Sequence, residues 1–135
     1  MKEDKIAVVA IAKDEDNYLA EWTDYHLRLG FDDIFIWQNN WRSKLQGKLG
    51  NKVHFNIIDE DHAQVKCYNM SLKLPHSIYS WLAFIDIDEF FSLNDTSFTS
   101  IKDFLLQDKY KDIPALCINW RLFGDNGLQK VESFS

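Results

Sequence analysis

Four short apolar runs alternate with longer polar segments along the chain, and we expect each run to form a strand. They span residues 5–12, 33–37, 53–58 and 81–87. The first run (KIAVVAIA) and the fourth (WLAFIDI) are almost continuously apolar, which is typical of strands covered on both faces. The pattern therefore predicts a buried sheet.

Between these strands the apolar side chains recur with helical spacing. In the first such segment they lie four, three and four residues apart, at Tyr18, Trp22, Tyr25 and Leu29. This spacing forms one stripe of an amphipathic helix, which Gly30 should end. A second helix is predicted from Val65, Tyr68 and Leu72, with Pro75 as its stop.

A third helix and a last strand are predicted near the end of the chain. Ser100 and Asp103 have the spacing of a capping box, directly before Phe104. Pro114 then precedes an apolar run over residues 115–120, which we expect to be a strand.

The expected order is strand, helix, strand, strand, helix, strand, helix, strand. Such alternation predicts an α/β fold in which a mostly parallel open sheet has helices on both faces, as in Rossmann-like folds. No linker, repeat or low-complexity run interrupts the pattern, so we treat residues 1–135 as a single domain.

Composition narrows the function classes. The chain has 15 Lys and Arg against 21 Asp and Glu, a formal net charge of −6, which argues against a nucleic-acid partner. The aromatic content of 15% excludes a disordered chain. Cys67 and Cys117 suit buried apolar positions better than a disulfide, so we expect a cytoplasmic location. No apolar run approaches the ~18 residues of a membrane span, which leaves membrane association to partners.

The sharpest chemical feature is the segment FIDIDEFF, which follows directly from the fourth apolar run. In an extended chain Asp86 and Asp88 would point to the same face, where they repel each other unless a cation lies between them. Mg²⁺ is typically held by one or two carboxylates and substrate phosphates, and the carboxyl edge of an open α/β sheet is the usual ligand site. The alternative is a solvated turn whose aspartates cap backbone N–H groups.

Polar residues also follow the first two predicted strands. They are Lys13, Asp14 and Glu15, and then Gln38, Asn39 and Asn40. Amide side chains both donate and accept hydrogen bonds, which suits the edge of a base or a sugar. The alternatives are helix-start charges for the first group and a turn for the second.

Two residues on the first predicted helix invite a functional interpretation but suit the core better. Trp22 lies on the apolar stripe, and His26 follows Tyr25 on its buried side. We expect Trp22 to be a core residue and His26 a hydrogen-bonded core histidine. The four histidines of the chain do not have zinc-site spacing.

Taken in order, these segments resemble the family-2-like nucleotide-sugar glycosyltransferases with the A-type fold, in the branch that carries an FIDxDEF element. The resemblance runs from about residue 8 to residue 134. Its anchors are Lys13, Glu15, Glu21, Trp22, His26, Gly30, Phe31, Asn39, Asn40, Tyr68, Asn69, Asp86, Asp88, Glu89, Phe90, Trp120, Phe123 and Gly124.

The resemblance implies a role for each part of the site. Asp88 would hold Mn²⁺ or Mg²⁺ on the diphosphate, and Asp86 would contact ribose or the metal and its water. The nucleotide-binding residues it implies are Ala12, Lys13, Glu15, Gln38, Asn39, Asn69 and Asp86. Gln38 stands where the family often has Asp, and an amide can still pair with uracil. The favoured donor is a UDP-sugar. Trp120 and Gly124 would lie on the acceptor side. Glu89 would either orient the metal ligands or help to bind on the acceptor side, and the first role is favoured.

The general base of an inverting transfer stays unassigned. In the family that carboxylate usually lies well beyond the DxD motif, so we expect it after Ser135. Asp125 and Glu132 are the late carboxylates present, with Asp125 in a loop. We therefore expect the chain to end before the acceptor half of the fold is complete.

The resulting hypothesis is the donor-binding part of a metal-dependent hexosyltransferase-like enzyme. It would transfer a sugar to a glycan or lipid-linked acceptor, as in surface polysaccharide or lipopolysaccharide synthesis. One alternative is an inert binding or assembly fragment that self-associates through an exposed apolar edge. Another is a phosphohydrolase that uses the first Asp of DxD as a nucleophile, although that chemistry usually has a small residue where Glu89 stands.

Overall fold

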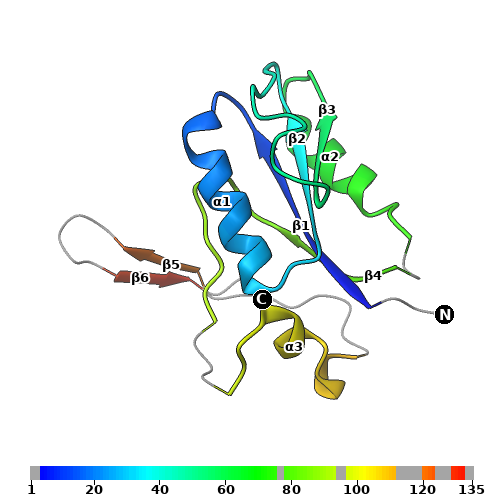
Figure 1. Ribbon diagram of the computed structural model, residues 1–135, viewed down its shortest axis with the longest axis vertical. Coiled ribbons are helices and arrows are strands. Elements are labelled where there is room, and N and C mark those ends of the chain that lie inside the picture. Colours follow the sequence, from blue (N-terminus) through cyan, green and yellow to red (C-terminus); the bar gives the residue numbers. More distant parts are fainter. Residues whose placement is uncertain (1–3, 76–77, 94–96, 112–119, 124–128, 133–135) are drawn as a thin grey trace.

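The computed structural model describes residues 4–75, 78–93, 97–111, 120–123 and 129–132 (Figure 1). Its elements follow the predicted order along most of the chain. They are β1 (Lys5–Ala12), α1 (Asp16–Leu29), β2 (Asp33–Gln38), β3 (Val53–Ile57), α2 (Ala63–Ser71), β4 (Tyr79–Phe84), α3 (Ile101–Leu105), a 3₁₀ turn (Asp108–Tyr110), β5 (Trp120–Phe123) and β6 (Gln129–Glu132).

Strands β1 to β4 form one open sheet with the order β3-β2-β1-β4, and every neighbouring pair is parallel. In the centre, Val8 pairs with Ile34 on one side and with Ala83 on the other. The carboxyl ends of all four strands therefore meet at one edge, which confirms the predicted α/β class with a mostly parallel sheet.

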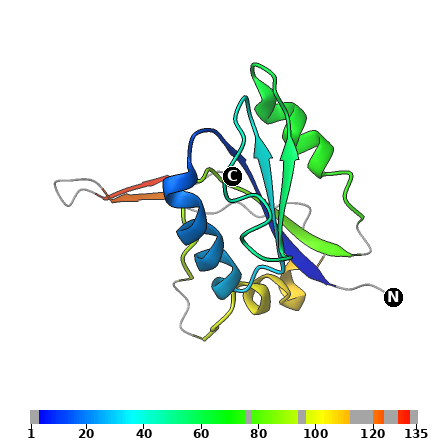
Figure 2. The same cartoon turned by 45° about the horizontal axis from the view of Figure 1, so that its top comes forward.

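The two faces of the sheet are covered by different helices. Ile6, Val8 and Ala10 belong to a core that also contains Leu19 and Trp22 of α1 and part of α3. Val9 packs on the opposite side, in a second core with the α2 residues Ala63 and Cys67. Figures 1 and 2 show α1 and α2 on opposite sides of β1. This alternation explains the unbroken apolar run, because both faces of β1 lose their contact with water.

Helix α1 ends where the sequence predicts, at Gly30. This residue has a φ of +125°, a conformation that side chains rarely adopt. A Cβ atom at Gly30 would lie 2.3 Å from Oγ of Ser100, so the glycine also lets α3 approach. Ser100 caps α3 by accepting a hydrogen bond from the Lys102 amide at 3.1 Å.

The predicted strand over 81–87 ends too late. Strand β4 stops at Phe84, and a turn follows in which the Glu89 amide donates to the Asp86 carbonyl at 3.0 Å. Ile87 is buried within this turn, with 1% of its surface exposed. The extended geometry expected for Asp86 and Asp88 is therefore wrong, because the chain folds back to bury the intervening isoleucine.

The predicted last strand, residues 115–120, is described only at its final residue. Residues 112–119, including Cys117 and most of the predicted strand, lie outside the described residues. Strand β5 begins at Trp120 and pairs antiparallel with β6 in a separate two-stranded sheet. This antiparallel pair stands beside the parallel main sheet, so the described strands are mostly but not all parallel, as the predicted class allows. In the part of the chain described here, no helix has both the length and the apolar character needed to cross a membrane.

Candidate functional site

Three carboxylates gather near the carboxyl edge of the sheet. Glu15 precedes α1, and Asp86 and Asp88 lie in the turn after β4. Burial raises the pKa of Glu15 above its ordinary value of 4.5, and the negative charges of Asp88 and Asp86 raise it further, against a hydrogen bond from the Lys13 amide. The sequence prediction that these acidic residues share one neighbourhood is thereby supported, although the local geometry is a turn.

Positive charge does not balance the two aspartates locally. Among the described residues, no Lys, Arg or His nitrogen lies within 4.0 Å of the Asp86 or Asp88 carboxylate. Nor do any three described His, Cys, Asp or Glu side chains form a group that could hold a metal ion. Two exposed carboxylates suit a cation whose remaining ligands come from phosphate oxygens and water, as is common for Mg²⁺.

Glu89 fixes the shape of the acidic turn. Its Oε1 atom accepts a hydrogen bond from the Asp86 amide at 2.8 Å, while its own amide donates to the Asp86 carbonyl. The side chain is half-buried and is occupied in holding Asp86. This geometry is consistent with the orienting role, which the sequence analysis favoured for Glu89 over the acceptor-side role. Both roles stay predictions.

Helix α1 supports the segment that follows the turn. Trp22 Nε1 donates to the Glu89 carbonyl at 2.8 Å, and the Tyr25 hydroxyl donates to the Phe91 carbonyl. His26 is completely buried and hydrogen-bonded. Trp22 and His26 are therefore core residues, as the sequence predicted, but their polar atoms bind the backbone next to the acidic turn.

A polar pocket of about 350 Å³ opens beside the acidic turn. The loops after β1, β2 and β3 and the turn after β4 all contribute to its lining, as expected for the carboxyl edge of a parallel sheet. The lining residues are Ile11, Lys13, Asn39, Asn40, Glu60, Asp61, His62, Ala63, Gln64 and Asp86.

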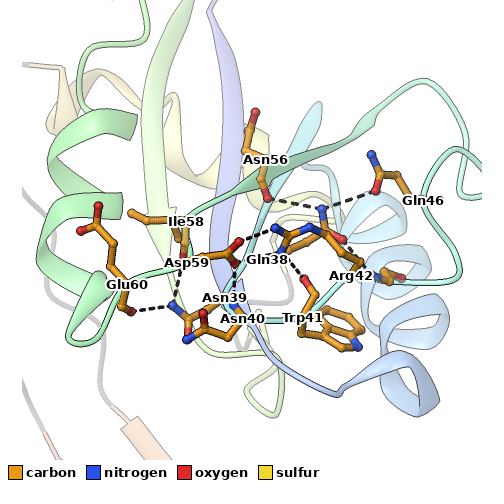
Figure 3. A network of polar contacts seen from close by, with 11 residues as sticks. Gln38, Asn39, Asn40, Trp41, Arg42, Gln46, Asn56, Ile58, Asp59 and Glu60 are labelled. Carbon is orange, nitrogen blue, oxygen red and sulfur yellow. Dashed lines mark hydrogen bonds and ion pairs between the residues drawn. The ribbon is translucent and has the colours of Figure 1, made fainter.

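The asparagines after β2 hold one wall of this pocket (Figure 3). Asn39 Nδ2 donates to the carbonyls of Ile58 and Glu60, both at 2.8 Å. The Asn40 amide donates to Asp59 Oδ1 at 2.7 Å, and Asn40 has a left-handed φ of +49°. Asn39 and Asn40 therefore have a structural role, as the turn interpretation of the sequence allowed, because they tie the loop after β2 to the loop after β3.

Asp59 is held in place by an ion pair with Arg42. The guanidinium contacts both carboxylate oxygens, with Nη1 at 2.9 Å from Oδ1. The hydrogen bond from Arg42 lowers the pKa of Asp59 below its ordinary value. The ion pair therefore ties the loop after β2, which contains Arg42, to the loop after β3, which contains Asp59 (Figure 3).

Gln38 lies inside the fold and not among the pocket residues. It is completely buried; its Oε1 accepts from the Ser43 amide at 2.8 Å, and its Nε2 lies 3.5 Å from Gln46 Oε1 and from the Asn56 carbonyl. These contacts support the loop between β2 and β3. The predicted contact of Gln38 with a base stays a prediction that this placement does not favour.

The other predicted nucleotide-binding residues lie at or near this edge. Lys13 lines the pocket, and the buried Ala12 accepts a hydrogen bond from the Asn39 amide through its carbonyl. Asn69 is exposed on α2 and is not among the lining residues. Tyr68 beside it packs on Phe84, and burial and then the nearby charge of Asp86 raise its pKa.

The predicted acceptor-side residues fall largely outside what the structure describes. Trp120 opens β5, whereas Gly124 and the base candidate Asp125 lie outside the described residues. Glu132 ends β6.

The sequence prediction missed the pocket residues Glu60, Asp61, His62 and Gln64. These residues belong to the loop after β3 and to the first turn of α2. The signal was available: this loop follows a parallel strand, so it must lie at the same edge as the loops after β1 and β2. His62, with a φ of +55°, directly precedes α2.

Comparison with known proteins gives distant relatives. The chain is 25% identical over 143 residues to a protein from Ricinus communis named as a glycosyltransferase family 92 protein, covering 96% of this chain. It is 25% identical over 145 residues to a protein of the same family name from Oryza sativa subsp. japonica, again covering 96% of this chain. The matches cover 25% and 23% of those two proteins, so the chain spans about a quarter of their length.

No family model matches the chain, and no solved structure matches it. The two relatives support the similarity to glycosyltransferases that the motifs indicated. They do not support the expected family-2-like branch, because both carry the family 92 name.

Proposed function

We propose that this chain is the donor-binding part of a metal-dependent glycosyltransferase, which transfers a sugar from a nucleotide diphosphate sugar to an acceptor hydroxyl. The observation that carries the proposal is the group formed by Glu15, Asp86 and Asp88 beside a polar pocket at the carboxyl edge of the sheet. The names of the distant relatives agree with this class of reaction.

Asp88 and Asp86 would hold Mn²⁺ or Mg²⁺, for which exposed carboxylates without cationic partners in the described chain are suitable ligands. When bound, such a cation would neutralise the charge that develops on the departing diphosphate. Glu89 would keep Asp86 in position through its hydrogen bond to the Asp86 amide.

The pocket would receive the nucleotide. The Lys13 ammonium has no carboxylate within 4.0 Å among the described residues, so it is available to pair with a phosphate. Carbonyl and amide groups around Asn39, together with Gln64, offer donors and acceptors for a base or a ribose. UDP is the favoured nucleotide, and the acceptor would be a glycan or a lipid-linked glycan of surface polysaccharide synthesis.

Calorimetry with UDP tests this function. We expect UDP to bind in the presence of Mn²⁺ and to lose most of its affinity when EDTA removes the metal. D88N should weaken the Mn²⁺-dependent binding by at least ~10-fold, because it removes a ligand charge.

D103N is the matched control, since Asp103 is an exposed residue of α3 and the substitution makes the same change in charge. It should bind UDP like the unmodified chain. UDP binding that is equal with Mn²⁺ and with EDTA, or equal in D88N and D103N, would contradict the proposal.

A further inference from the structure

Three side chains of α1 converge on the segment that follows the acidic turn. Tyr25 and His26 follow Trp22 by three and four residues, so each lies one helical turn from Trp22 on the same side of the helix. Each makes a hydrogen bond to the backbone of Glu89 or Phe91. Helix α1 therefore holds this segment at both of its ends.

The position of the His26 proton follows from its two partners. Nδ1 lies 2.8 Å from the Trp22 carbonyl, which can only accept, so Nδ1 carries the proton. Nε2 is then free of a proton and accepts the hydrogen bond of the Phe91 amide at 3.2 Å. Burial lowers the pKa of His26 to about 4, which keeps this neutral form at physiological pH.

Aromatic packing fixes the orientation of the imidazole. The Phe90 ring stacks on it at 5.7 Å with an angle of 19° between the planes, and the Trp22 ring lies 4.6 Å away. The ring therefore has little freedom to turn, and its Nε2 remains directed at the Phe91 amide.

A continuous series of contacts links this helix face to the acidic turn. Trp22 binds the Glu89 carbonyl, and the Glu89 carboxylate in turn accepts from the Asp86 amide. The carboxylates of Asp86 and Asp88 both act on Glu15, so the turn keeps like charges near one another in the absence of a cation. Repulsion of this kind favours opening of the turn, and the contacts with α1 oppose it.

We propose that His26 is a positioning residue for the cation site. Its neutral imidazole accepts the Phe91 amide and thereby holds the acidic turn in the geometry that binds the metal and the diphosphate. The inference rests on the proposed function, because the site that His26 serves is the proposed cation site. Within the described part of the chain, the polar atoms of His26 bind only main-chain atoms, so the required property is a hydrogen-bond acceptor at this point.

The test compares H26F, H26Q and T23V. H26F keeps an aromatic ring but removes the acceptor, whereas H26Q retains a side chain that can accept. T23V is the matched control, because Thr23 is a buried residue of the same helix whose hydroxyl bonds only the Ala20 carbonyl. Y25F is a milder variant that removes only the hydroxyl donor to Phe91.

Two measurements are made on each variant: hydrogen exchange of the Phe91 amide without metal, and Mn²⁺ affinity by electron paramagnetic resonance. We expect H26F to speed exchange and to weaken Mn²⁺ binding by at least ~10-fold, as is typical when a group behind a metal ligand is removed. H26Q should recover most of that loss, Y25F should weaken binding by only ~3-fold, and T23V should match the unmodified chain.

The outcomes separate the two proposals. Failure of the unmodified chain to bind Mn²⁺ in the presence of UDP would overturn the proposed function. Tight Mn²⁺ binding that is equal in H26F and T23V would overturn the positioning role of His26 and leave the proposed function standing. Unchanged protection of the Phe91 amide in H26F would also overturn that role, whatever the metal does.

Discussion

Two pairs of aspartates at opposite edges of the sheet differ in how the fold compensates their charge. At the amino edge, Asp33 is almost buried and accepts hydrogen bonds from the Tyr79 hydroxyl at 2.7 Å and from His54 Nε2 at 3.0 Å. Its neighbour Asp32 accepts from the Ile6 amide and pairs with Lys102 at 2.9 Å. The negative charges of Asp32 and Asp33 therefore both have partners supplied by the fold.

At the carboxyl edge, Asp86 and Asp88 are exposed, have no cationic partner among the described residues, and raise the pKa of Glu15. Compensated charges support a fold, whereas a group of uncompensated like charges destabilises it unless a ligand binds there. The contrast is consistent with a structural role for Asp32 and Asp33 and supports the proposed binding role of Asp86 and Asp88.

The largest expected effect comes from breaking the amino edge. D33A would leave the Tyr79 hydroxyl and the His54 imidazole without their shared acceptor, at a cost of about 2–3 kcal/mol in the free energy of unfolding. Urea denaturation measures this loss, with D103N as the control. A loss in D33A no larger than that in D103N would show that the pairing at this edge is not structural.

At low pH the folded chain should lose the stability that the neutral His26 contributes beside the carboxyl edge. Its pKa in the folded chain is about 4, below the ordinary 6.5, so the unfolded chain binds a proton more readily. The contribution of His26 to stability is therefore complete above pH 6.5 and is lost as the pH falls toward 4, by on the order of 3 kcal/mol.

Urea denaturation between pH 7 and pH 4 measures this slope, and H26Q should flatten it. Equal slopes in H26Q and in the unmodified chain would contradict the neutral, buried state of His26.

The smallest effect on stability is expected at the carboxyl edge itself. D88N should leave the free energy of unfolding at pH 7 within ~0.5 kcal/mol of the unmodified chain, or raise it slightly, because it removes an exposed like charge. The raised pKa of Glu15 means that its ionisation disfavours the folded state as the pH rises above 4.5, and D88N should reduce that penalty.

A carboxyl NMR titration of Glu15 checks this directly. The pKa of Glu15 should move toward its ordinary value in D88N and stay unchanged in D103N. A Glu15 pKa that is the same in all three chains would show that Asp88 does not belong to the acidic group.

Local patterns predicted much of this architecture. The spacing of Tyr18 to Leu29 and the stop at Gly30 indicated α1, and the unbroken run of β1 indicated a strand with two covered faces. Such features depend on neighbours in sequence. The position of the acidic residues at one edge could also be predicted, because the carboxyl ends of parallel strands lie at the same edge of a sheet.

Long-range contacts determined the rest. The turn after β4 depends on the burial of Ile87 and on contacts with α1, which strand periodicity does not contain. Gln38 is buried because its side chain accepts a hydrogen bond from the Ser43 amide, so this polar residue at the end of β2 supports the fold. The hydrogen bonds of Trp22 and Tyr25 to the segment after Asp88 span more than 60 residues and had no signal in the helix pattern.

The most direct test of the contrast is a Mn²⁺ titration followed by electron paramagnetic resonance on the unmodified chain, D88N and D33N. D33N is preferred to D33A here because asparagine retains an acceptor for Tyr79 and His54. We predict that the unmodified chain and D33N bind Mn²⁺ with equal affinity, and that D88N binds at least ~10-fold more weakly. Equal Mn²⁺ binding in D88N and the unmodified chain, or its loss in a folded D33N, would contradict the account.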